Sequence, residues 1–182
     1  MSWSKFKVKC KKDSVQWSNP PVIAPPTTNA QGVPAFSQVA VVGTQLFVAG
    51  QRARTLPVPP GAIPLDFTER VRQTYRNMKL AAEYMGSDLS QCLRIVVYLA
   101  GINDADPQRD AKFIEMREVC NNVQNEAEFW GNGNKPPRTI LGVSWLNQQG
   151  TPALGNDPRQ VEVEGTFYLP KKECVVVQRC GC

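Results

Sequence analysis

Short apolar runs divide the middle of the chain into predicted strands. Runs at residues 39–42, 45–51 and 93–100 are rich in Val, Leu, Ile and Phe and fit the length of a strand. The first two runs are separated only by Gly43-Thr44, which predicts a hairpin. The third run is almost continuously apolar, so we expect it to be a central strand of the sheet.

Two other stretches space their apolar residues by three and four, which is typical of an amphipathic helix. In the first stretch, Asp66 or Thr68 can cap the start of the helix, and Gly86 can end it. The second covers roughly residues 108–123. Two helices can cover only one face of a sheet. The other face should therefore stay partly apolar and favour association with other chains.

The last two predicted strands carry a candidate site. Two prolines stand directly before Arg138, and because proline donates no backbone N–H, the ladder should begin at that arginine. Residues 161–165 alternate apolar and acidic positions at the start of a predicted strand over 161–169, which places Glu162 and Glu164 on one face. If the two strands pair, Arg138 and Glu162 can meet at one end of the sheet. They would then hold a small carboxylate beside an acid/base, or form only a structural ion pair.

The predicted order is β-β-α-β-α-β-β, an α+β domain with a mixed β-sheet and two α-helices on one face, spanning residues 31–170. Residues 1–30 are predicted to be an extended N-terminal segment outside the core, and residues 171–182 a C-terminal tail. Because both ends lack a periodic apolar pattern, residues 28–170 are expected to fold and associate without them.

Composition narrows the chemistry. The 182 residues suffice for one domain, and the net charge of +5 comes largely from lysines near the two ends. The chain has no histidine, which argues against Ser/His/Asp and Cys/His hydrolases and against a histidine-ligated zinc enzyme. Acid/base chemistry would fall to Glu, Asp, Tyr, Lys, Cys or water. Without an apolar leader or spanning segment, we expect a cytoplasmic protein that uses no membrane. We also expect no metal or cofactor.

The six cysteines fall into two groups. Cys92 and Cys120 lie inside predicted elements and should behave as small buried hydrophobic residues. The others lie in the terminal segments: Cys10, Cys174, Cys180 and Cys182. Their spacing is not the paired C-x-x-C of a zinc site, which leaves a tail disulfide or free exposed thiols as the alternatives.

Six short segments share their order and spacing with a known family. They are Phe36-Ser37-Gln38, Val48-Ala49-Gly50-Gln51, Asn77-Met78-Lys79, Val96-Val97-Tyr98-Leu99, Pro137-Arg138-Thr139 and Val161-Glu162-Val163-Glu164. Across residues 31–170 the chain resembles the reactive-intermediate deaminase family (Rid, or YjgF-type), which are small enamine and imine deaminases. The resemblance implies a chorismate-mutase-like fold and a homotrimer whose sheets line a central barrel, with active sites in the clefts between subunits.

The resemblance also implies roles for individual residues. Arg138 would bind the substrate carboxylate, Glu162 would position the attacking water, and the backbone of Gly50 would approach the substrate. Phe36 stands where family members commonly carry a tyrosine, so a hydroxyl group is missing at the mouth of the site. A polar substrate contact on the second helix would fall near Arg109 or Asp110.

The implied reaction is hydrolysis of reactive 2-imino or enamine acids to 2-oxo acids and ammonia, without a cofactor. Two alternatives stay open. The missing hydroxyl at Phe36 is compatible with a catalytically silent trimer that binds a small carboxylate. An RNA-binding or ribonuclease role, credited to some family members, is supported only by the basic ends and is disfavoured by the lack of histidine.

Overall fold

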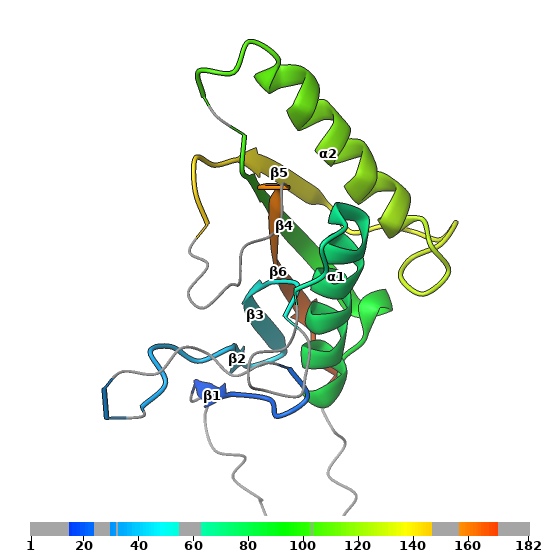
Figure 1. Ribbon diagram of the computed structural model, residues 1–182. Helices are drawn as coiled ribbons and strands as arrows, with labels where there is room; N and C mark the ends of the chain where they lie inside the picture. Colours follow the sequence, from blue (N-terminus) through cyan, green and yellow to red (C-terminus); the bar gives the residue numbers. More distant parts are fainter. Residues whose placement is uncertain are drawn as a thin grey trace, which may run out of the picture.

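A computed structural model describes residues 15–23, 30–31, 33–54, 63–102, 104–146 and 157–170. The four terminal cysteines lie outside these ranges. The elements form one six-stranded sheet with the order β1-β2-β3-β6-β4-β5, together with two α-helices (Figure 1). In chain order they are β1 (Gln16–Ser18), β2 (Val39–Val42), β3 (Gln45–Gln51), α1 (Phe67–Tyr84), the short 3-10 helix η1 (Leu89–Gln91), β4 (Cys92–Ala100), α2 (Arg109–Gln124), β5 (Arg138–Gly142) and β6 (Gln160–Tyr168). The predicted α+β class is confirmed.

The sheet is mixed, because β4 runs parallel to β5 while the other neighbours are antiparallel. The predicted hairpin joins β2 to β3 through Gly43, whose φ of 61° is readily accessible to glycine. Strand β4 lies inside the sheet between β6 and β5, as its apolar run predicted. Strand β5 begins at Arg138, so the two prolines stay outside the ladder.

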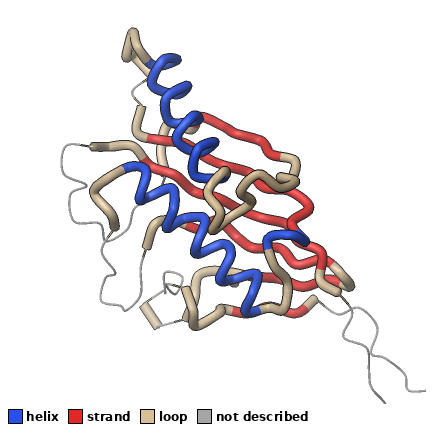
Figure 2. Tube along the Cα trace, turned by 90° about the vertical axis from the view of Figure 1, so that its right-hand side faces the viewer, coloured by secondary structure: helices blue, strands red, loops and turns tan. Residues whose placement is uncertain are grey.

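Both helices cover the same face of the sheet (Figure 2). The Asp66 side chain accepts a hydrogen bond from the backbone N–H of Glu69 at the start of α1, and Gly86 follows its end with a φ of 89°. The core between the helices and the sheet consists mainly of alternating residues from the strands and of the apolar stripe of α1. In β6 this alternation buries Val161, Val163, Gly165 and Phe167 toward the helices and turns the residues between them to the opposite face.

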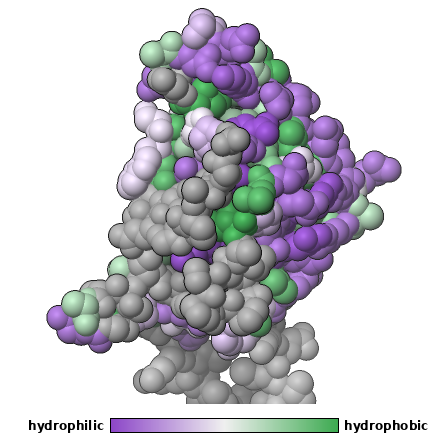
Figure 3. Space-filling view, in the orientation of Figure 1, coloured by the Kyte–Doolittle hydropathy of each residue, from purple (hydrophilic) through white to green (hydrophobic). Residues whose placement is uncertain are grey.

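The face of the sheet away from the helices, called the open face below, carries exposed apolar side chains. Phe47 on β3 is 41% exposed and Trp17 on β1 is 67% exposed. Hydrophilic side chains instead gather over the side where α1 and α2 lie (Figure 3). The sequence-based expectation of a partly apolar uncovered face therefore holds. Among the described residues, no helix combines the length and apolarity needed to span a bilayer.

The prediction that residues 1–30 lie outside the core is wrong for residues 16–23. Strand β1 pairs with β2 and widens the sheet, and Ile23 is only 2% exposed within the core. The backbone N–H of Gln38 donates a hydrogen bond of 2.9 Å to Asn19 Oδ1, which ties this segment to the start of β2. A strand of three residues has too few positions to show an alternating pattern, so the sequence did not reveal it.

The turn after α2 also contributes to the core. Phe129 and Trp130 are buried beside Tyr75 of α1, with ring centroids 5.6 and 5.9 Å from that of Tyr75. The indole N–H of Trp130 donates to the carbonyl oxygen of Leu89 at 3.1 Å. These contacts fix the end of α2 against α1.

A buried arginine connects two distant parts of the backbone. Arg70 of α1 is 2% exposed, and its guanidinium donates to the carbonyl oxygens of Pro64, at 2.7 Å, and of Leu65. It also donates to the carbonyl oxygens of Asp157, at 3.1 Å, and of Arg159. The chain is therefore held in place where it enters α1 and where it enters β6.

Candidate functional site

Glu162 lies on the open face of β6 and is pressed against the end of β3. The pairing of β3 with β6 shifts its register between Val48 and Gln51, which brings Gly50 against the Glu162 side chain. A Cβ atom at residue 50 would lie 2.1 Å from Glu162 Oε1, so only glycine fits beside this carboxylate. The two residues that the family resemblance singled out on these strands are thus direct neighbours.

Arg52 holds the other side of the same carboxylate. Its Nε donates to Glu162 Oε2 at 2.5 Å, and the two side chains are 35% and 20% exposed. Among the described residues, none donates a hydrogen bond to Glu162 Oε1. The sequence-based reasoning missed Arg52, although a basic residue directly after the Gly50-Gln51 strand end was a usable signal.

Helix α1 fixes the backbone that carries Arg52. The buried amide of Asn77 donates to the carbonyl oxygens of Arg52 and Arg54 at 2.6 and 2.7 Å. Gln73, one turn earlier, donates to Asn77 Oδ1 at 2.8 Å and so sets the orientation of the amide. In the sequence, Asn77 is only one residue of a shared segment, whereas in the structure it connects α1 to the candidate site.

Arg138 faces the helices. It pairs with Ile95, whose side chain is fully buried in the core on that face. Its guanidinium donates to Gln124 Oε1 and, at 2.5 Å, to Asn121 Oδ1, both near the end of α2. The arginine is therefore oriented by two neutral amide oxygens, which leave its positive charge uncompensated by them.

The predicted meeting of Arg138 and Glu162 at one end of the sheet is wrong within a single chain. Strand β4 lies between β5 and β6, so the two strands do not pair. Glu162 is opposite Tyr98 on the open face, whereas Arg138 points to the helix side. The expected ion pair between them is replaced by the pair of Glu162 with Arg52. The sequence correctly predicted the strand that begins at Arg138 and the strand that carries Glu162. It could not predict that a third strand lies between them.

Phe36 lies shortly before β2, and its side chain is 49% exposed. The segment is tied to β3 by the backbone N–H of Ala49, which donates to the carbonyl oxygen of Gln38 at 2.8 Å. The roles inferred for Phe36, Gly50, Arg138 and Glu162 remain predictions.

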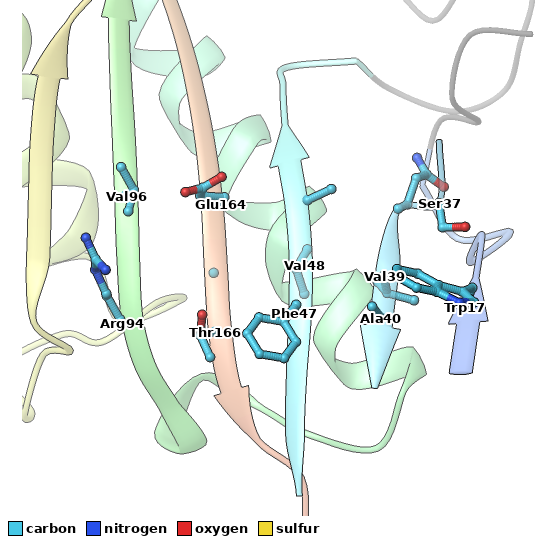
Figure 4. Close-up of a pocket in the computed structure, with 13 residues that line it drawn as sticks. Trp17, Ser37, Val39, Ala40, Phe47, Val48, Arg94, Val96, Glu164 and Thr166 are labelled. Atoms are coloured by element: carbon cyan, nitrogen blue, oxygen red, sulfur yellow. The ribbon is translucent and has the colours of Figure 1, made fainter. Parts of the chain in front are cut away.

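A hollow of about 330 Å³ lies on the open face. A row of side chains crosses it from strand to strand, because Arg94 is opposite Thr166, Thr166 is opposite Phe47, and Ala40 lies between Phe47 and Trp17 (Figure 4). This floor is mainly apolar in its β1–β3 half and polar toward β4.

A second hollow, of about 300 Å³, lies between the start of α2 and the end of β5. Arg109 and Asp110 line it together with Phe113. This is the helix position where the resemblance implies a polar substrate contact. Arg138 and Glu162 are not among the described residues that line either hollow.

Burial suppresses the ionisation of other reactive groups. It raises the pKa of both Cys92 and Cys120 to about 12, so both thiols stay protonated at neutral pH. The pKa of Tyr98 is also raised, first by burial and then by its hydrogen bond of 3.0 Å to Glu164. Within the described part of the chain, no three His, Cys, Asp or Glu side chains are grouped as a metal site requires. The candidate chemistry therefore centres on Glu162.

Comparison with known proteins gives the class. The family model described as Endoribonuclease L-PSP matches residues 27–152, so the chain belongs to this family, which includes the Rid and YjgF-type proteins. A RutC family protein from Pyrococcus horikoshii is 32% identical over 114 residues, which cover 61% of this chain and 75% of that protein.

Solved structures agree with this assignment. The structure called a probable translation initiation inhibitor from Rhodopseudomonas palustris has a TM-score of 0.64 and 27% identity, covering 86% of this chain and 99% of that one. Two more distant structures support the fold. E. coli TdcF with bound serine has a TM-score of 0.58 at 19% identity, covering 85% of this chain and 100% of its own. The Rid family protein YyfA from Yersinia pestis has a TM-score of 0.61 at 15% identity, covering 86% and 100%.

Proposed function

We propose that this protein hydrolyses 2-imino acids, or their enamine tautomers, to 2-oxo acids and ammonia. The observation that carries the proposal is how the two oxygens of the Glu162 carboxylate are held. Arg52 fixes one of its oxygens, and the other lies against the Gly50 backbone without a donor among the described residues. A carboxylate held in this way can bind a water molecule through its open oxygen and orient it toward a substrate beside Gly50.

The reaction then proceeds by addition of water and loss of ammonia, and the protein needs only to move protons between them. The water oxygen bonds to the imine carbon as a proton passes from the water to Glu162, and the electron pair of the C=N bond moves to nitrogen. Glu162 returns this proton to the nitrogen, which gives a carbinolamine, and then transfers the hydroxyl proton of the carbinolamine to the same nitrogen. The C–N bond breaks as the C=O bond forms, and ammonia leaves. Arg138 would hold the substrate carboxylate through two parallel charge-assisted hydrogen bonds.

Arg138 and Glu162 lie on opposite faces of one chain, so a site containing both would draw them from two subunits. We propose a homotrimer in which the open face is covered by neighbouring copies and the sites lie between subunits. The exposed Trp17 and Phe47 on this face support association. Light scattering at micromolar concentration is expected to give the mass of three chains. A clean monomer mass would refute the assembly.

Subunit mixing tests whether the site is shared. Arg138→Ala and Glu162→Ala trimers should each be inactive. After the two are mixed and allowed to exchange subunits, about one quarter of the interfaces should contain both native residues and regain activity. If each chain held a complete site of its own, every site in the mixture would lack one residue, and no activity would return.

Ammonia release from an imino acid freshly generated by an amino acid oxidase tests the reaction. Glu162→Gln should lower the rate by about 10²–10⁴-fold, the usual range for a general acid/base. Glu164→Gln is the matched control, because this glutamate lies two residues further along the same face and bonds to Tyr98. Equal rates for the wild type and Glu162→Gln, or no acceleration over spontaneous hydrolysis, would refute the proposal.

The same proteins distinguish two other functions. The family model and several neighbours are described as endoribonucleases or translation inhibitors, so RNA cleavage should be assayed in parallel. Binding of a small carboxylate without ammonia release would instead indicate a silent binding protein. The absence of a hydroxyl group at Phe36 is compatible with this alternative function.

A further inference from the structure

We propose that Arg52 selects substrates with a second carboxylate, so that the preferred imino acids are those derived from acidic amino acids. The proposal rests on the deaminase function above and adds a substrate class to the same site. The proposal is based on the observation that the Arg52 guanidinium contacts Glu162 through only one of its three nitrogens. Only Nε contacts Glu162, while Nη1 and Nη2 have no acceptor among the described residues.

A guanidinium has two edges that can bind a carboxylate. In Arg52 the contact to Glu162 occupies the edge at Nε, and the outer edge, formed by Nη1 and Nη2, is free within the described structure. The side chain is 35% exposed, so a ligand can reach it. This outer edge has the planar, two-point geometry that recognises a carboxylate. Acidic amino acids yield imines that present such a group.

Arg52 is also held in position before any ligand arrives. Asn77 fixes the Arg52 carbonyl group from helix α1, and Glu162 fixes the guanidinium from strand β6. Because the Arg52 side chain is already held, substrate binding costs little further conformational entropy, which favours affinity for a ligand of matching length. Arg54, two residues further along, has its carbonyl group held by the same amide, but within the described part of the chain Glu162 forms its ion pair with Arg52.

Charge points to the same substrate class. Arg52 and Arg138 with Glu162 give the site a net charge of one positive unit. A protonated imine with one carboxylate is neutral overall and would leave that charge uncompensated. A protonated imine with two carboxylates carries one negative charge and would balance it. Arg138 would hold the carboxylate next to the imine carbon, and Arg52 the one on the side chain.

Imines generated from glutamate and from norvaline test the proposal, because the two have the same number of carbons and differ in the second carboxylate. The wild type should show a kcat/KM for the glutamate imine about tenfold to a hundredfold above that for the norvaline imine. Arg52→Gln should remove most of this preference while reducing norvaline turnover much less. Arg52→Lys should restore part of it, because charge returns without the planar fork. Arg54→Gln is the matched control and should keep the preference.

Two results would overturn the proposal. Equal turnover of both imines by the wild type would show that no diacid is selected. An equal loss on both substrates in Arg52→Gln would show that Arg52 only orients Glu162.

Product binding separates this inference from the deaminase function. Calorimetry compares 2-oxoglutarate with 2-oxopentanoate and needs no turnover. If neither imine were hydrolysed, the deaminase function would fail, yet tighter binding of 2-oxoglutarate that is lost in Arg52→Gln would still support the role of Arg52. Unchanged binding in that variant would refute it.

Discussion

The contact between Gly50 and Glu162 gives the sharpest test of the site. In Gly50→Ala the new methyl group would lie 2.1 Å from Glu162 Oε1 and 2.6 Å from Cδ, whereas ordinary contact begins at 3.4 Å. The carboxylate must therefore retreat by more than about 1 Å. Gly50 has no positive φ, so alanine introduces no backbone strain and the side chain of Glu162 absorbs the whole displacement.

A displacement of about 1 Å at a catalytic group costs on the order of a hundredfold in rate, equivalent to about 2.7 kcal/mol of transition-state stabilisation. Stability should change by less than about 1 kcal/mol, because the partly exposed Glu162 side chain can turn away and alanine also restricts the unfolded chain. We expect a strong loss of kcat/KM in the ammonia-release assay together with a nearly unchanged melting temperature.

A double-mutant cycle isolates the cause. Glu162→Ala removes the carboxylate, and the methyl group of Gly50→Ala then has no carboxylate to displace. Adding Gly50→Ala to Glu162→Ala should therefore have little further effect on rate. If the two losses were instead additive, the methyl group would act independently of Glu162, and the interpretation of this contact would be wrong.

Four further predictions follow from named contacts. Arg138→Lys should reduce kcat/KM nearly as much as Arg138→Ala, by about 2–4 kcal/mol, because lysine lacks the two-point fork; near-full turnover would exclude a carboxylate clamp. Phe36→Tyr adds a hydroxyl at an exposed position and should be neutral or raise turnover up to about tenfold; loss of both activity and stability would contradict this placement. Ile23→Ala should cost about 2–4 kcal/mol in urea unfolding, against little for the more exposed Val22→Ala, and equal effects would show that this segment does not pack. Burial raises the pKa of Cys120 to about 12, so the contribution of this thiol to the free energy of unfolding is full below the ordinary thiol pKa and is lost as the pH rises toward 12. Cys120→Ala should flatten this decline of stability with pH. An unchanged dependence of stability on pH would contradict burial of Cys120 as its cause.

Local pattern was enough to predict most of the fold. Helix α1 follows from its apolar stripe, its Asp66 cap and its terminal Gly86, and the start of β5 follows from the two prolines before Arg138. The acidic residues of β6 were placed correctly on the face opposite Val161. In each case the decisive interaction is between near neighbours in the chain, and sequence spacing records such interactions directly.

The rest depends on contacts between distant parts of the chain. The position of β4 between β5 and β6 separates Arg138 from Glu162, and nothing local to any strand specifies that order. The ion pair of Arg52 with Glu162 spans 110 positions, and it required the register shift beside Gly50. The family resemblance selected residues by type and place. It gave no signal for Arg52, because this position was not part of the shared segments.

The buried Arg70 bears on how the molecule tolerates change in its length. By holding carbonyl groups just before α1 and just before β6, it sets the entry of both elements independently of the chain preceding them. Residues 55–62 and 147–156 each lie directly upstream of such an anchored point. Doubling the number of residues in a connection between two fixed points costs only about 0.6 kcal/mol in closure entropy. Insertions at these two places can therefore accumulate during evolution while the sheet, and Glu162 upon it, stays where it is.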